Sequence, residues 1–206
     1  MSLNAIFIAP TGGKIPQSLL IMLHGWGAHA EDLAPLASML SLGDCQIIFP
    51  NAPFPHPEVS GGRAWYVLKT LDYQGLSQSQ NLLQNWLFSL ENQTGVPLSR
   101  TVLAGFSQGG AMSLDVGLKL PLAGICSLSG YLHFQPQATQ FSCSPILITH
   151  GIQDMVVPIQ AAREAKDALT DIGAMVEYHE LNGGHEISST TLAILQQFIQ
   201  KIVKLI

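Results

Sequence analysis

The sequence predicts an α/β fold in which a mostly parallel, twisted sheet is covered by helices on both faces. Along the chain, short apolar runs alternate with longer stretches whose apolar residues recur at helical spacing. This alternation favours βαβ units, which pair their strands in parallel. The chain has 206 residues, of which 47% are hydrophobic, and this is enough for one domain with a full core. Because no repeat, linker or charge block divides it, we expect a single domain over residues 1–206.

Seven apolar runs are predicted strands, because each is short and lies between turn-forming or helical stretches. They cover residues 3–8, 19–23, 46–49, 101–106, 122–128, 146–149 and 175–179.

Three stretches between or after these runs are predicted helices. The clearest covers residues 158–172, with a proline at its first position, apolar residues on one face and Gly173 just past its end. Apolar residues at helical spacing over 82–90 predict another, which ends near Gly95. A third, over 192–203, has so few charges that docking on the sheet is favoured over lying on a membrane surface.

Composition argues against nucleic acid as a partner. The formal net charge is −5, whereas nucleic-acid binding uses a basic patch that this sequence lacks. No apolar run approaches the ~20 residues of a membrane span. The N-terminus has neither the basic segment nor the long apolar core of a secretory signal. We therefore expect a cytoplasmic protein without a membrane span, of an oligomeric state that the sequence does not specify.

The three cysteines, Cys45, Cys126 and Cys143, do not indicate a disulfide framework, because an odd number cannot all pair within one chain. Cys126 lies in an apolar run and is interpreted as a packed strand residue. A catalytic cysteine is the weaker interpretation, since no neighbour in the sequence would lower a thiol pKa.

The first motif with chemical content is Gly105-Phe106-Ser107-Gln108-Gly109. A buried-strand pattern precedes it and a stretch that can start a helix follows it. This strand–turn–helix setting is the one in which a nucleophile elbow presents a serine in the α/β-hydrolase fold. Its glycines let helix and strand approach closely around a strained serine. The alternative interpretation is an ordinary glycine-rich turn.

A serine hydroxyl needs a base to take its proton and a third group to orient that base. In this fold the order along the chain is serine, acid, histidine. His185 is the predicted base, because it lies in a glycine-rich loop directly after the last predicted strand. His179 falls inside that strand, and His133 lies in a polar loop without a strand end to fix it.

Asp154 is the predicted acid, because it lies in a loop just beyond the strand at 146–149. Asp115, Asp167 and Asp171 stand at helical spacing, where a solvated face is expected. His150, in the same loop region as Asp154, is interpreted as shaping the turn without taking part in the chemistry.

The segment His24-Gly25-Trp26-Gly27 follows the strand at 19–23 and is a candidate oxyanion loop. Acyl transfer requires donors for the tetrahedral oxyanion, and backbone amides at such a turn supply them. We expect the amides of Trp26 and Gln108 to form this hole. All four motifs fall at the carboxyl ends of predicted strands, the edge where parallel sheets place their sites.

Together these motifs, with the segment His150-Gly151-x-x-Asp154-x-x-Val157-Pro158 and the ending Gly184-His185-Glu186, resemble the carboxylesterase/acyl-protein thioesterase (phospholipase/carboxylesterase) family over nearly the whole chain. The resemblance implies Ser107, Asp154 and His185 as a catalytic triad, with no cofactor and no metal. One departure is Val67, which stands where the family carries an aspartate.

The expected substrate is a small-molecule ester or an acylated molecule. The interval 129–144 is too short for a helical lid domain, so we expect an open site covered mainly by the loop 50–66. Trp65 is a candidate substrate-binding residue. Phe54, Trp65 and Tyr66 either wall an acyl pocket or anchor this long loop on the sheet. An open groove suits a protein thiol, a lysophospholipid head or a small soluble ester.

Three other interpretations stay open. The first is a non-catalytic binding module on a hydrolase scaffold, although all three triad members are present. The second is a peptidase-type serine hydrolase, or a dienelactone hydrolase, which would carry a cysteine in place of Ser107. A metallohydrolase is the weakest, because the histidines lack paired ligand spacing.

Overall fold

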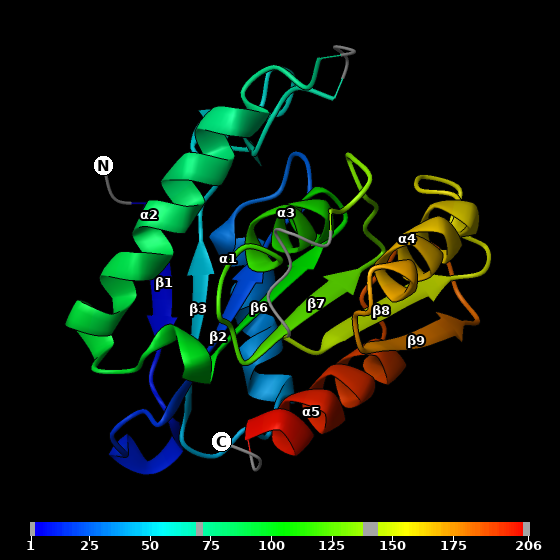
Figure 1. The fold of residues 1–206 in the computed structure, drawn as a ribbon. Helices are drawn as coiled ribbons and strands as arrows, with labels where there is room; N and C mark the ends of the chain where they lie inside the picture. The colour runs from blue at the N-terminus through cyan, green and yellow to red at the C-terminus, as the bar shows by residue number, and fades with distance from the viewer. Residues whose placement is uncertain (1–2, 69–71, 138–143, 204–206) are drawn as a thin grey trace.

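The computed structural model describes residues 3–68, 72–137 and 144–203. Its centre is a seven-stranded sheet with the order β1-β3-β2-β6-β7-β8-β9 (Figure 1). All neighbouring strands pair in parallel except β1, which runs antiparallel to β3 at one edge. The strands are β1 (Ala5–Ile8), β2 (Ser18–Leu23), β3 (Cys45–Pro50), β6 (Thr101–Phe106), β7 (Gly124–Leu128), β8 (Ile146–Gly151) and β9 (Val176–Leu181).

Helices cover both faces of this sheet, as Figure 1 shows. On one face lie α2 (Leu76–Thr94), α3 (Gln108–Gly117) and α4 (Ile159–Asp171), packed on strand residues such as Ile21 and Leu103. On the other lie α1 (Ala30–Leu33) and α5 (Ser189–Val203), packed on the alternate residues, such as Met22 and Ala104. Successive side chains of a strand point to opposite faces, so each central strand contributes to two cores. The α/β-hydrolase fold with a mostly parallel sheet is confirmed.

All seven predicted strands are present, and no end differs from its predicted position by more than two residues. The helix predicted from Pro158 begins one residue later, because Pro158 has extended backbone angles and caps α4. Gly173 ends that helix region at a φ of +87°, as a glycine past a helix end does. Helix α2 is longer than its leucine pattern indicated, running from Leu76 to Thr94.

Several short elements lie outside the predicted ones. A small hairpin pairs β4 (Phe54–Pro55) with β5 (Arg63–Ala64) above the sheet edge. Single turns of 3-10 helix form η1 (Thr11–Gly13) and η3 (Leu98–Arg100), and a longer one, η2 (Ala34–Met39), directly follows α1.

The interval between β7 and β8, where a lid would be inserted, contains no helix in its described parts, 129–137 and 144–145. Residues 138–143, with Cys143 among them, lie outside the described residues. Cys45 and Cys126 are free and buried. In the described part of the chain, no helix is long and apolar enough to cross a membrane.

Candidate active site

Ser107 stands between the end of β6 and the start of α3, in a strained backbone conformation. Its φ of +55° and ψ of −117° are rarely adopted by residues with a side chain. Two flanking glycines make this turn possible, because a Cβ on Gly105 would overlap the Gly109 carbonyl, and one on Gly109 would overlap the Leu23 carbonyl. The amide of Ser107 donates to Leu128 O on β7 at 2.8 Å, which ties the turn to the sheet.

His185 and Asp154 meet across two loops that follow neighbouring strands, β9 and β8. The distance between His185 Nδ1 and Asp154 Oδ2 is 2.6 Å, and the carboxylate is not exposed. Asp154 Oδ1 accepts the amides of Val156 and Val157, both at 2.8 Å. Burial acts to raise the pKa of Asp154, but the hydrogen bonds from His185 and the two amides outweigh it and hold that pKa below its ordinary value. An ionised Asp154 accepts the proton on Nδ1, so the neutral His185 ring keeps its lone pair on Nε2.

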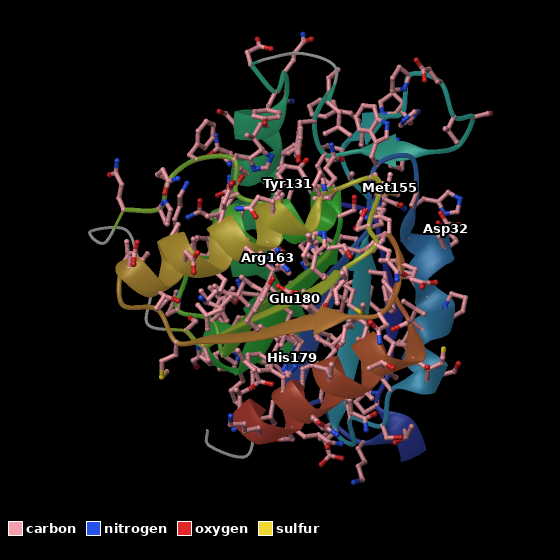
Figure 2. The ribbon with its side chains drawn as sticks, turned by 90° about the vertical axis from the view of Figure 1, so that its right-hand side faces the viewer. Asp32, Tyr131, Met155, Arg163, His179 and Glu180 are labelled. Atoms are coloured by element: carbon pink, nitrogen blue, oxygen red, sulfur yellow. The ribbon has the colours of Figure 1, made fainter. Side chains whose placement is uncertain are left out.

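Ser107 and His185 both line a cavity of about 840 Å³, which we call the groove. Trp26 and Gln108 line it too, so the structure brings the predicted nucleophile, base and oxyanion-hole residues to one place, with Asp154 behind His185. Their catalytic roles stay predictions. Figure 2 shows Tyr131 and Asp32, which line the groove, on two sides of Met155. Most of the lining is apolar, with contributions from Leu33, Leu36, Leu68, Phe106, Leu132, Val156, Val157, Pro158, Ala161 and Ile187.

The candidate oxyanion amides belong to Gln108, directly after Ser107, and to the loop that passes beside Ser107. A Cβ on Gly25 would lie 3.3 Å from the Cβ of Ser107, so the loop that carries Trp26 passes directly beside the serine. Gln108 is the first residue of α3, where amides lack a partner within the helix. In residues 3–68, 72–137 and 144–203, neither the Trp26 nor the Gln108 amide donates to a protein acceptor. Both are therefore available to a developing negative charge.

His24, for which the sequence pattern indicated no separate role, holds this loop in place. Its Nε2 accepts the Ala52 amide at 3.0 Å, so the proton is on Nδ1, which donates to Gly25 O at 2.8 Å. The ring is fully buried, and burial lowers its pKa to about 4. His24 is thus a neutral structural histidine that fixes the strand-to-loop turn.

The structure does not place Trp65 among the residues that line the groove, so nothing in the fold supports its predicted role in substrate binding. Its side chain is fully buried, and its indole N–H donates to His24 O at 3.0 Å. The Gln108 side chain accepts from the Trp65 amide at 2.9 Å and donates to Tyr66 O at 2.8 Å. Trp65 and Tyr66 therefore anchor the long loop on the core, which was the second interpretation of these aromatics.

Asp115 does not lie on a solvated helix face as expected. Its side chain is 8% exposed, and Oδ2 lies 2.7 Å from His133 Nδ1 and 2.8 Å from Gln80 Nε2. This contact was not predictable from sequence spacing, because His133 lies in the loop after β7 and Asp115 on α3. Asp115 and Gln80 also line a second cavity, of about 210 Å³, that shares Leu132 with the groove.

His150 shapes the turn at Asp154. Its Nε2 lies 2.8 Å from Val157 O and 3.3 Å from Asp154 Oδ2, and its side chain is not exposed. Among the residues that the structure describes, no group of three or more histidine, cysteine, aspartate or glutamate side chains is arranged to hold a metal ion.

Comparison with known proteins gives consistent results. A phospholipase/carboxylesterase family model matches residues 4–203. An acyl-protein thioesterase 1 homolog of Dictyostelium discoideum is 32% identical over 77% of both chains. Acyl-protein thioesterase 1 of Schizosaccharomyces pombe is 30% identical over 98% of this chain and 97% of that protein. The crystal structure of esterase PE8 superimposes with a TM-score of 0.91 at 30% identity, covering 98% of this chain and 100% of the other.

Proposed function

The chain belongs to the phospholipase/carboxylesterase family and is a carboxylic ester hydrolase, and from this premise we propose that it acts through an acyl-enzyme on Ser107. His185 is the general base and acid in this mechanism, and Asp154 orients it. The amides of Trp26 and Gln108 form the oxyanion hole. The substrates are carboxylic esters or acyl thioesters.

In the first half of the reaction, Ser107 Oγ attacks the carbonyl carbon while His185 Nε2 takes the hydroxyl proton. The carbonyl oxygen becomes an oxyanion that accepts hydrogen bonds from the two amides. When the intermediate collapses, the bond to the leaving alcohol or thiol breaks, and that group receives the proton from His185. A water molecule then repeats the sequence on the acyl-enzyme and releases the carboxylic acid.

The observation that carries this proposal is the 2.6 Å contact between His185 Nδ1 and a buried Asp154, at a groove that Ser107 also lines. The contact supports the tautomer that a general base needs, with a lone pair on Nε2. The conformation of Ser107 supports its role as nucleophile, because a strained elbow exposes the hydroxyl above the sheet.

The lining of the groove supports an acyl chain as the bound part of the substrate. It is mainly apolar, and its two carboxylate residues, Asp32 and Glu186, are both exposed. A volume of about 840 Å³ lies within the range of small-molecule sites. Several relatives are named acyl-protein thioesterases, which favours thioesters of acylated proteins as one substrate class. A cytoplasmic location stays a prediction from the sequence.

The test is a hydrolysis panel that crosses acyl length with two leaving groups, an alcohol and a thiol. We expect turnover with both, because the triad acts on the acyl carbonyl that they share, and a rise in kcat/KM with acyl length as apolar contacts with the groove increase. A fluorophosphonate probe should label the protein at Ser107. Absence of both turnover and labelling would favour the binding-module alternative.

A further inference from the structure

The loop that carries the Trp26 amide is hydrogen-bonded through its backbone to the β4–β5 hairpin, residues 54–64. Gly27 N donates to Arg63 O at 2.9 Å, and Arg63 N donates to Ala28 O at 3.0 Å. The two backbones touch at Gly62, where a Cβ would lie 2.5 Å from the Gly27 carbonyl oxygen. The position of this loop is therefore coupled to the position of the hairpin.

Inside the hairpin, His56 is 9% exposed and closes the turn with its own side chain. Its Nδ1 accepts two amides, from Glu58 at 3.1 Å and from Val59 at 2.9 Å. An imidazole nitrogen that accepts hydrogen bonds carries no proton, so the proton of the neutral ring is on Nε2. Within the described residues, this buried Nε2 has no hydrogen-bond partner.

The ring that carries this proton packs against Trp26. The centroids of the two rings are 4.4 Å apart, and their planes meet at 69°, which is an edge-to-face arrangement. Edge-to-face pairs of aromatic rings are attractive and directional, because the edge of one ring is positive and the face of the other is negative. The same ring also lies beside Gly27, where a Cβ would be 3.5 Å from His56 Cδ2.

We propose that His56 is a positioning residue for the oxyanion hole. Its Nδ1 fixes the hairpin turn and its ring packs against the Trp26 ring, so that the backbone that carries the Trp26 amide is held in place beside the groove. His56 is not among the residues that line the groove, so it acts through Trp26 and does not touch the substrate. This inference rests on the proposed function, in which the Trp26 amide stabilises the oxyanion.

The main variant is His56→Asn, because an asparagine Oδ1 takes nearly the place of Nδ1 and keeps the two amide hydrogen bonds while the ring is removed. Kinetics are measured on one ester, together with the affinity for a trifluoromethyl ketone of the same acyl chain, which forms a tetrahedral adduct with Ser107. Loss of a whole oxyanion donor costs about 10²–10³ in kcat. Misalignment of one donor should therefore lower kcat by about 5- to 50-fold. KM should stay within about twofold, and the affinity for the ketone should fall by the same factor as kcat.

A matched control and a partner variant complete the experiment. His179→Asn changes a histidine on β9, away from the groove (Figure 2), and should leave both readouts within about twofold. Trp26→Leu removes the other ring and should lower kcat and the affinity for the ketone together. In the double variant, His56→Asn should then cause no further loss, because the contact that it removes is already absent. This partner variant also tests the contact if His56→Asn does not fold.

The outcomes separate the two proposals. If the ketone does not inhibit the wild-type protein, the proposed function fails, and the role of His56 fails with it. If the ketone does inhibit the wild-type protein, two results for His56→Asn would show that His56 has no role in positioning. One is that kcat and the affinity for the ketone stay within twofold of wild type, and the other is that only KM changes. Additive losses in the double variant would equally overturn the contact with Trp26.

Discussion

Asp154 and His185 are held together by a 2.6 Å hydrogen bond although they come from different loops, one after β8 and one after β9. Two backbone amides, from Val156 and Val157, fix the same carboxylate from the other side. The carboxylate is therefore held by hydrogen bonds through both of its oxygens, and it orients the imidazole without a bound substrate.

Asp154→Asn should keep this shape but present an amide N–H to His185, which forces the imidazole proton onto Nε2. The base would then be in the wrong tautomer, and we expect kcat to fall by up to about 10⁴-fold. Asp167→Asn is the matched control, because that side chain is 66% exposed on α4, and it should cost almost nothing. Equal losses in the two variants would show that Asp154 is not the acid.

Ser107→Ala should abolish both ester hydrolysis and labelling by a fluorophosphonate, because the Oγ that forms the acyl-enzyme is gone. Circular dichroism and thermal unfolding should show that the fold survives, since alanine is only one atom smaller. Labelling that persists in the folded variant would assign the nucleophile to another residue.

Gln108→Ala should destabilise the protein by about 2–5 kcal/mol, because it leaves the Trp65 amide and the Tyr66 carbonyl buried without a partner. Urea unfolding measures this change. Gln93→Ala, at an exposed position of α2, should change stability by no more than about 0.5 kcal/mol. Fluorophosphonate labelling of the folded variant should persist, since the backbone amide of residue 108 is kept. An unchanged unfolding free energy would mean that the long loop is anchored elsewhere.

The stability of the protein should fall between neutral pH and about pH 4 because of His24. Burial lowers the pKa of His24 to about 4 in the folded chain, whereas an unfolded-chain histidine titrates near ~6.5. Between these values the unfolded chain binds a proton that the folded chain does not. The contribution of His24 to the free energy of unfolding is thus complete above its pKa in the unfolded chain. It is lost, by about 3 kcal/mol, as the pH falls towards its pKa in the folded chain.

The check is urea unfolding of wild type and His24→Gln at several pH values between 7 and 4.5. Glutamine can still accept the Ala52 amide but does not titrate, so the pH dependence of its unfolding free energy should be shallower. Parallel curves for the two proteins would show that His24 does not titrate differently in the folded and unfolded states.

Removal of divalent metals by EDTA should leave kcat/KM within about twofold, because no step of the proposed mechanism uses a metal ion. The measurement compares dialysed protein with and without added zinc, on the same ester. A loss of activity that zinc restores would favour the metallohydrolase interpretation.

The sheet and the site loops were predictable because both rest on local pattern. Apolar runs define strands whatever their neighbours, and the carboxyl ends of parallel strands must meet at one edge. The direction of β1 was not predictable, since an apolar run looks alike in both orientations. Nor were α1 and the β4–β5 hairpin, which are too short to show a period.

The surroundings of Trp65 and Asp115 were not predictable, for a common physical reason. An aromatic residue in a loop beside a site has the same sequence appearance whether its ring faces the groove or the core. An aspartate at helical spacing looks solvated unless its partner is known, and the partner of Asp115 is a histidine from a distant loop. Both depend on contacts between segments that only the folded chain brings together.

The shared wall at Leu132 has a consequence for how this molecule can evolve. The groove of about 840 Å³ and the cavity of about 210 Å³ both end on this side chain. A smaller residue there would widen both cavities at this wall, and a bulkier one would narrow them. If the groove holds the acyl chain as proposed, the preferred chain length can therefore change by substitution of Leu132, which is not one of the proposed catalytic residues.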